Sequence, residues 1–151
     1  GVYGFDILFD HIETNMELYT ESQLNIFVGD ARSDINHLSK RLKSLKLDYN
    51  IHIGISLVAY LGLMDVMLRL NRKDAYGVSI KEALDLGVEV VATTVCKRPA
   101  GCVLFDADDK ASFKSIIEDF LKGRPLKKKT NIVPTFYDRE LLNFYKKHEF
   151  I

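Results

Sequence analysis

The sequence predicts an α/β domain in which helices cover both faces of a mostly parallel sheet. Short apolar runs rich in β-branched residues, such as residues 24–28 and 88–92, are expected to be buried strands. Stretches with apolar residues three and four positions apart lie between such runs, which is the pattern of amphipathic helices. Because the two patterns alternate along the chain, the expected architecture is a Rossmann-like three-layer α/β/α domain.

The clearest βαβ unit lies in residues 65–95. Gly77 lets the backbone turn into the helix without a Cβ in the way, and Gly87 supplies a left-handed residue that ends the helix. Between the two glycines, Ile80, Ala83, Leu84 and Leu86 are expected on or near the buried side of the helix. The expected elements are a strand at residues 66–70, a loop at 71–76, a helix at 78–86 and a returning strand at 88–92.

The other elements follow from the same two patterns. At the start of the chain, Phe5, Leu8, Phe9 and Ile12 have the spacing of one helix face. The expected elements are, in order, a helix at 6–13, a strand at 24–28, a helix opened by Ser33 and Asp34, a turn at 48–50, a strand at 51–53, a short buried helix at 56–64, a loop at 93–101, a strand at 102–105, and a helix closed by Gly123.

Residues 1–123 are expected to form one domain of ordinary size. A parallel α/β domain is expected to open with a strand and a glycine loop, whereas the first helical pattern here starts almost at residue 1. The sequence is therefore interpreted as a fragment that lacks its leading strand. Residues 124–151 are expected to form an irregular linker at 124–134 and a final helix, from Asp138 to about His148, that packs on the domain.

Charge gives no reason to expect a nucleic-acid partner, because 21 Lys and Arg residues balance 21 Asp and Glu residues. The basic run at residues 127–129 is interpreted as a solvated linker or, alternatively, as a contact with an anionic membrane or partner. No apolar run reaches the roughly 18 residues of a membrane-spanning helix. Cys96 and Cys102 lack a disulfide pattern and metal-ligand spacing, so reduced thiols in a cytoplasmic protein are expected.

A phosphate is expected at the amino end of the helix at 78–86. In open α/β sheets, ligands bind outside the carboxyl ends of the strands, where helix N-termini direct free N–H groups outward. The anion would lie near Gly77, Val78 and Ser79. Two carboxylates flank this position, Asp74 in the loop and Glu82 in the first turns of the helix, with seven residues between them.

The phrase at residues 74–83, Asp-Ala-Tyr-Gly-Val-Ser-Ile-Lys-Glu-Ala, resembles a signature of the retaining, nucleotide-sugar-dependent glycosyltransferases with the GT-B fold, the glycosyl transferases group 1 family. That family usually has E-G-F-G-x-x-x-x-E-A, followed by a run ending in G-x-P-V-V-A-S. Here Asp74 replaces the first Glu and Glu89 replaces the Pro. Further similarities lie at residues 3–6, 24–30 and 51–54, so the resemblance covers residues 2–123, one half of a GT-B fold.

The resemblance implies a role for each residue around this helix. Glu82 would accept hydrogen bonds from the ribose hydroxyls of the nucleotide, and Asp74 would contact the donor sugar. The backbone N–H groups of Gly77, Val78 and Ser79 would hold the diphosphate. The plainer alternatives are that Glu82 is an acidic residue favoured by the helix dipole and that Asp74 only forms a turn.

The resemblance implies two further binding positions. His52 and Gly54 stand where the family wraps the base of the nucleotide, although a lone histidine in a strand is more often simply packed. The family's basic phosphate ligands come from a loop that this sequence lacks, so Arg69 is the candidate replacement. Other basic residues that could serve in the same way are Arg72, Lys73, Lys97 and Arg98.

The expected function is that of the donor-binding domain of a glycosyltransferase, which moves a sugar from a UDP- or GDP-linked donor to a saccharide, lipid or protein acceptor with retention. The resemblance implies no metal or other cofactor, an N-terminal acceptor-binding domain as partner, and inactivity of this fragment alone. Polysaccharide biosynthesis in the cytoplasm, or at the inner face of the membrane, is the expected setting. The alternatives are a flavodoxin-like or receiver-like protein-interaction module without catalysis and a GT-B epimerase.

Overall fold

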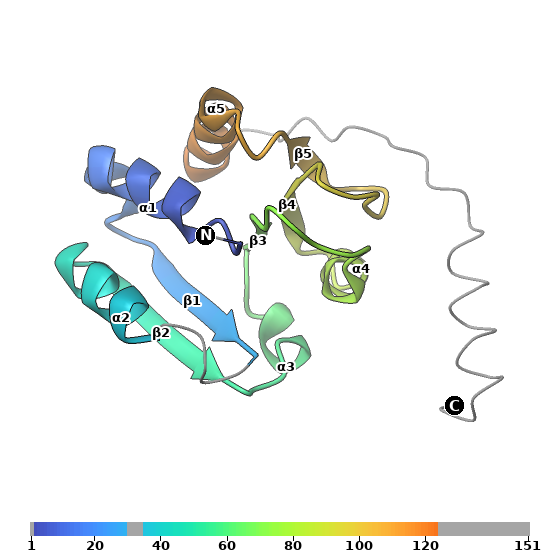
Figure 1. The fold of residues 1–151 in the computed structure, drawn as a ribbon, viewed down its shortest axis with the longest axis horizontal. Coiled ribbons are helices and arrows are strands. Elements are labelled where there is room, and N and C mark those ends of the chain that lie inside the picture. The colour runs from blue at the N-terminus through green and yellow to red at the C-terminus, as the bar shows by residue number, and fades with distance from the viewer. Residues whose placement is uncertain (1, 30–34, 124–151) are drawn as a thin grey trace, which may run out of the picture.

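The computed structural model describes residues 2–29 and 35–123 and shows an α/β domain with parallel strands (Figure 1). The fold class expected from the sequence is therefore confirmed. Two expectations lie outside the described residues: the helix start at Ser33 and Asp34, and the linker and final helix in residues 124–151.

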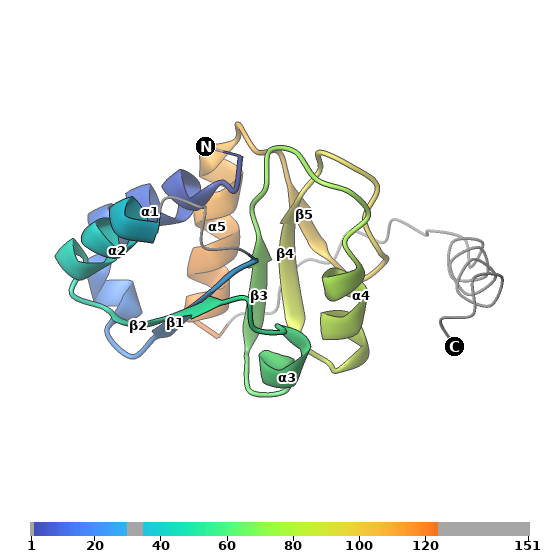
Figure 2. The ribbon, with the colours of Figure 1, turned by 60° about the horizontal axis from the view of Figure 1, so that its bottom comes forward.

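The strands form two parallel sheets rather than one. In the first sheet, β1 (Gln23–Val28) pairs with β2 (Asp48–Ile53). In the second, β4 (Glu89–Thr93) lies between β3 (Val66–Arg69) and β5 (Val103–Phe105). Figure 2 shows the first sheet turned relative to the second. Within the described part of the chain, β1 and β3 are therefore both edge strands.

Helices connect these strands and cover both faces of the three-stranded sheet. Figure 2 shows α4 and α5 on opposite faces of that sheet, and α1 and α2 together on one side of the β1–β2 sheet. The helices are α1 (Phe5–Thr14), the 3-10 turn η1 (Met16–Tyr19), α2 (Ile35–Ser44), α3 (Val58–Leu61), α4 (Val78–Asp85) and α5 (Lys110–Leu121). This arrangement gives the expected three layers.

The core consists of two clusters on the two faces of the β3–β4–β5 sheet. Because side chains alternate along a strand, Val91 of β4 points into the larger cluster, while Val90 and Ala92 point into the smaller one. The larger cluster also receives Ile12 of α1 and Phe113 of α5, and it extends to β1 and α2. This larger cluster is what joins the two sheets.

Two of the expected elements have bounds that differ from the expectation by more than one residue. Residues 48–50, expected to be a turn, are the first half of β2, because they pair in register with Gln23, Leu24 and Asn25 of β1. The short helix expected at 56–64 is confined to Val58–Leu61. For residues 48–50 a tertiary contact decides the conformation, which local residue preferences do not reveal.

The start of the chain is held against the end of β3. The Arg72 N–H donates to the carbonyl of Val2 at 2.8 Å, and both Arg72 Nη atoms bind the Asp6 carboxylate at 2.7 and 2.8 Å. Gly4, with φ of 66°, lies so close that a Cβ there would be 2.0 Å from the carbonyl oxygen of Leu70. Helix α1 therefore begins directly at the carboxyl end of β3.

Candidate functional site

Helix α4 begins where the sequence predicts, directly after Gly77. Gly77 has φ of 83°, and a Cβ there would lie 2.9 Å from Ile80 Cδ1 and 3.4 Å from Arg98 Nη1. Both the left-handed backbone and the lack of space therefore favour glycine. No side chain caps this helix end. The N–H groups of Val78 and Ser79 have no acceptor within the helix, as is usual for a first turn.

Asp74 lies in the loop between β3 and α4 and is bound by two arginines. Arg69 donates from Nε and Nη2 to the two carboxylate oxygens at 2.8 and 2.9 Å, and Arg98 Nη1 donates at 2.7 Å. The Ala75 N–H adds a hydrogen bond at 3.0 Å. Burial acts to raise the pKa of Asp74, but the hydrogen bonds from Arg69 and Arg98 outweigh it and hold the pKa well below its ordinary value.

Arg98, one of the basic residues considered as a phosphate ligand, is instead a buried anchor for this loop. Its side chain is 0% exposed. Besides Asp74, its guanidinium donates to the carbonyls of Thr93 at 3.0 Å and Ala75 at 3.1 Å, and to the Thr93 hydroxyl at 3.3 Å. Thr93 in turn donates to the carbonyl of Asn71 at 2.6 Å. The carboxyl ends of β3 and β4 are thereby joined.

The charges of this network do not cancel. Arg69 and Arg98 contribute two positive charges, and Asp74 contributes one negative charge, which leaves one positive charge beside the amino end of α4. The Arg69 side chain is 32% exposed, so its outer face is open to an incoming anion. A helix N-terminus adds partial positive charge at the same place. The electrostatics of this end of the sheet therefore favour an anion.

Glu82 is half-buried on α4 and lies in the second turn, between the buried residues Ile80 and Ala83 in sequence. The oxygens of Asp74 are engaged by the two arginines and the Ala75 amide. Both carboxylate oxygens of Asp74 therefore already accept hydrogen bonds within the protein.

His52 and Gly54 lie at the end of β2, in the other sheet from Gly77. The His52 ring stacks on Phe27 with a centroid distance of 4.4 Å and lies 4.7 Å from the ring of Tyr60. Its Nε2 is 3.0 Å from Asn25 Oδ1. These contacts account for His52 as a packed residue. Gly54 has φ of 64° and open space around it, which fits a turn after the strand.

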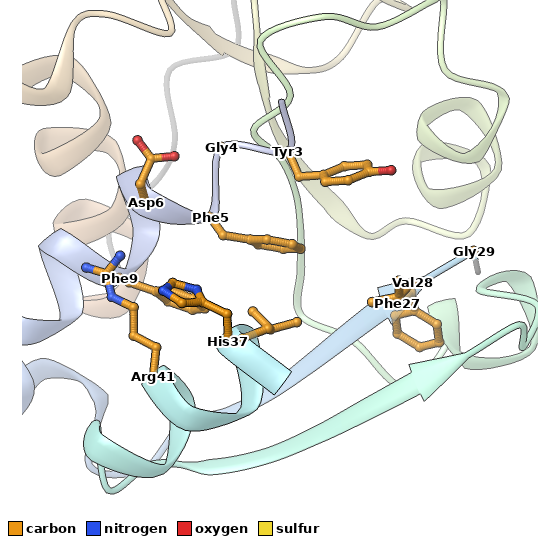
Figure 3. Close-up of a pocket in the computed structure, with 11 residues that line it drawn as sticks. Tyr3, Gly4, Phe5, Asp6, Phe9, Phe27, Val28, Gly29, His37 and Arg41 are labelled. Atoms are coloured by element: carbon orange, nitrogen blue, oxygen red, sulfur yellow. The ribbon is translucent and has the colours of Figure 1, made fainter. Parts of the chain in front are cut away.

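A cavity of about 370 Å³ lies at the carboxyl end of β1, between α1 and α2 (Figure 3). Its size is within the range of small-molecule sites, and no sequence pattern predicts it. Most of its lining is apolar, and its polar rim is already paired: Asp6 binds Arg72, while Arg41 binds Asp10 and Glu13. The Arg72 hydrogen bonds lower the pKa of Asp6 to about 2. This cavity offers no evident chemistry.

Cys96 and Cys102 are both free thiols, as expected from the sequence. Burial raises the pKa of the Cys102 thiol to about 11.

In residues 2–29 and 35–123, no cluster of three or more His, Cys, Asp or Glu side chains has the arrangement of a metal site. Over the same residues, none of the helices has both the length and the apolar character needed to cross a membrane.

The structure thus brings together Arg69, Asp74, Gly77, Val78 and Ser79 and leaves His52 and Gly54 on the other sheet. The part that the sequence did not reveal is the Arg98–Asp74 ion pair, because these two residues are 24 positions apart in the chain. No protein-family model matches this sequence, and no curated protein matches it. The fold and the helix end define the class: a Rossmann-like α/β domain with a positively charged loop at the start of α4.

Proposed function

We propose that this chain is the donor-binding domain of a retaining GT-B glycosyltransferase and that it binds the diphosphate of a nucleotide sugar at the amino end of α4. The observation that carries the proposal is the start of α4 at Gly77, without a side-chain cap, beside two arginines that share one carboxylate. The signature-like phrase at residues 74–83 gives this anion site its nucleotide-sugar interpretation.

In this proposal the diphosphate accepts hydrogen bonds from the N–H groups of Val78 and Ser79. The absence of a capping side chain supports this arrangement, because nothing on the described helix competes for those donors. Arg69 supplies the charged contact through the part of its guanidinium that Asp74 does not occupy. Guanidinium groups suit this task because their planar fork matches phosphate oxygens.

Asp74 receives a different role from the one that the family resemblance implies. Its oxygens already accept hydrogen bonds from Arg69, Arg98 and the Ala75 amide, so a direct contact with the donor sugar would require the loss of these bonds. We therefore assign Asp74 a positioning role, in which it fixes the Arg69 guanidinium. Glu82 keeps its proposed role as the acceptor for the ribose hydroxyls, which suits an ionised carboxylate.

The proposed reaction transfers the sugar from the donor to an acceptor hydroxyl with retention of configuration. The positive charge at the start of α4 would stabilise the leaving diphosphate, which requires no metal ion. The acceptor site would come from an N-terminal domain of the same enzyme, so the 151-residue chain is proposed to bind donor without turnover. The proposal extends to an enzyme of polysaccharide biosynthesis in the cytoplasm or, alternatively, at the inner face of the membrane.

Isothermal titration calorimetry of the chain with UDP, GDP and their sugar conjugates tests the proposal. Binding of at least one nucleoside diphosphate is expected, and Arg69→Gln is expected to weaken it at least tenfold. Arg41→Gln is the matched control, because it removes an arginine that pairs with carboxylates of α1 and lies outside the proposed site. Absence of heat with every nucleotide, or equal weakening by both variants, would contradict the proposal and favour a non-catalytic interaction module.

A further inference from the structure

The β1–β2 sheet has one face that points away from the helices. Figure 2 shows α1 and α2 on the other side of this sheet. The side chains that point toward them belong to the larger core cluster or pack against it: Leu24, Ile26, Val28, Tyr49 and Ile51. Because side chains alternate along a strand, the residues between them point the opposite way. Among these, which we call the open face, some are exposed (Gln23, Asp48, Asn50) and the others are half-buried (Asn25, Phe27, His52).

Three side-chain amides form a hydrogen-bonded row across the open face. The register of the two strands places Gln23 opposite Asp48 and Asn25 opposite Asn50. Gln23 Nε2 donates to Asp48 Oδ2 at 2.7 Å, and Asn25 Nδ2 donates to Gln23 Oε1 at 3.3 Å. Asn50 Nδ2 in turn donates to Asn25 Oδ1 at 3.3 Å. The amides are therefore oriented relative to one another by contacts within the protein.

The amide row keeps donors and acceptors for a ligand. A primary amide has two N–H donors, and its oxygen has two lone pairs that accept hydrogen bonds. Asn50 donates one N–H to Asn25, and its oxygen accepts no hydrogen bond from the described residues. Gln23 and Asn25 likewise each donate one of their two amide N–H groups within the described structure. Adjacent donors and acceptors of this kind match the neighbouring hydroxyl groups of a sugar, each of which both donates and accepts.

An aromatic cluster adjoins the amide row. His52 Nε2 lies 3.0 Å from Asn25 Oδ1, and the His52 ring centroid lies 4.7 Å from that of Tyr60 on α3. Phe27 packs against both rings, with centroid distances of 4.4 Å to His52 and 5.4 Å to Tyr60. Tyr60 is half-buried, so part of its ring stays accessible. Because a sugar ring carries apolar carbon-bound hydrogens that pack on an aromatic ring, the open face offers hydroxyl partners and a stacking surface side by side.

The charge of the open face distinguishes a sugar from other extended ligands. Asp48 is the one charged residue among its six members, and β1 and β2 contain no Lys or Arg. A single-stranded nucleic acid also stacks on aromatic rings, but its phosphates need a positively charged groove. The centre of a protein interface is usually apolar, whereas the centre of this face is a row of amides. A neutral, hydroxyl-rich ligand fits the face best.

We propose that the open face binds a neutral oligosaccharide, with sugar hydroxyls hydrogen-bonded to Gln23, Asn25 and Asn50 and one sugar ring packed on Tyr60. A strand rises about 3.3 Å per residue, so the face extends about 13 Å from residue 23 to residue 27, which suits a short chain rather than a single sugar. The face lies on the other sheet from Gly77. The inference rests on the composition of this face and is independent of the proposed function.

Nuclear magnetic resonance titration of the 151-residue chain tests this inference, because side-chain amides give their own signals. The probes are maltohexaose, cellohexaose and mannohexaose. Saturable shifts of the Gln23, Asn25 and Asn50 side-chain amides are expected with at least one of them. Asn50→Ala is expected to weaken this binding about fivefold. Asn15→Ala is the matched control, since it removes an amide that bonds to the carbonyl of His11 on α1, and it is expected to leave the affinity unchanged.

Tyr60→Leu tests the stacking contribution separately. Leucine keeps an apolar side chain against Phe27 and His52 but has no flat ring. The affinity is expected to fall about fivefold, while circular dichroism shows that the fold is retained. The Asn50→Ala comparison does not depend on this variant, because Asn50 is exposed and its side chain is not part of either core cluster.

Several results would overturn the inference. One is that none of the three oligosaccharides shifts the side-chain amides of the row, and another is that Asn15→Ala weakens binding as much as Asn50→Ala. Shifts confined to Val78 and Ser79 would place the sugar at α4 instead. Stronger shifts of the row with a short oligothymidylate would assign the face to single-stranded nucleic acid. Shifts that appear without ligand as the protein concentration rises, together with dimer formation in sedimentation, would assign it to a second copy of the chain.

Discussion

Arg98 carries its positive charge in a place that water does not reach, and Asp74 is the carboxylate that balances it. The two side chains are 0% and 7% exposed, and Arg98 Nη1 lies 2.7 Å from Asp74 Oδ2. A buried charge that loses its partner keeps its desolvation cost without compensation. The pair therefore determines whether the loop between β3 and α4 holds its conformation.

Asp74→Ala is expected to destabilise the domain by about 3–5 kcal/mol, because it leaves the buried Arg98 guanidinium without a counter-charge. Urea unfolding followed by circular dichroism measures the change. Asp85→Ala is the matched control: it also removes an aspartate from an ion pair, with Lys81, but that pair is exposed. Its expected effect is below about 1 kcal/mol. Similar losses in the two variants would refute the structural role of Asp74.

The sequence predicts only part of this residue network. Gly77 is recognisable because a glycine directly before an amphipathic pattern is typical of a left-handed entry into a helix. The Asp74–Arg98 pair is not recognisable, since neither residue has a periodic pattern and the contact forms only when β3 and β4 become neighbours. For the same reason Asp74 resembles a ligand contact in the sequence, and its partners are visible only in the structure.

Two helices of this domain, α1 and α4, begin after a left-handed glycine at the carboxyl end of β3. Gly4 precedes α1 and Gly77 precedes α4, with φ of 66° and 83°. At Gly77 the nearest atom to an added Cβ is the flexible end of Ile80, so the main penalty there is the backbone conformation. The entry to α4 thus depends on one residue that has no side chain.

Gly77→Ala is expected to destabilise the domain by about 1–2 kcal/mol, because an L-residue is strained in the left-handed region. Gly62→Ala is the control, since Gly62 has φ of −66° and open space around it. That control is expected to be neutral or to stabilise the domain by up to about 1 kcal/mol. Chemical denaturation of both variants measures the difference. A neutral Gly77→Ala would mean that α4 can begin with another backbone geometry.

The sequence predicts a strand well where the strand is buried on both faces of the sheet. It predicts a partly exposed strand less well. β4 is buried on both faces, so its continuous apolar run indicates a strand directly. β2 alternates between exposed and half-buried residues, and Asp48 and Asn50 look like turn formers. They are strand residues because β1 offers partners in register. The division into two sheets is likewise a tertiary feature that no local pattern reveals.

At the scale of the whole molecule, the two sheets are expected to differ in the free energy that is needed to open them. Val90, Val91 and Ala92 of β4 are 0% exposed, and β4 has a strand on each side. Opening β4 therefore breaks two ladders and disrupts both core clusters. The β1–β2 sheet has one ladder and several half-exposed residues, and of the two core clusters only the larger one contains its residues.

Native-state hydrogen exchange at low urea concentrations is therefore expected to resolve two levels of opening. Amides of β1 and β2 that face each other should exchange through a partial opening with a small urea dependence, whereas β4 amides should require global unfolding. Val90→Ala separates the two levels, because Val90 belongs to the smaller cluster, which contains no β1 or β2 residue. It is expected to lower the exchange free energy of β4 by roughly 2 kcal/mol and to leave the β1–β2 opening unchanged. If all strands instead share one free energy and one urea dependence, the larger cluster holds both sheets as a single cooperative unit.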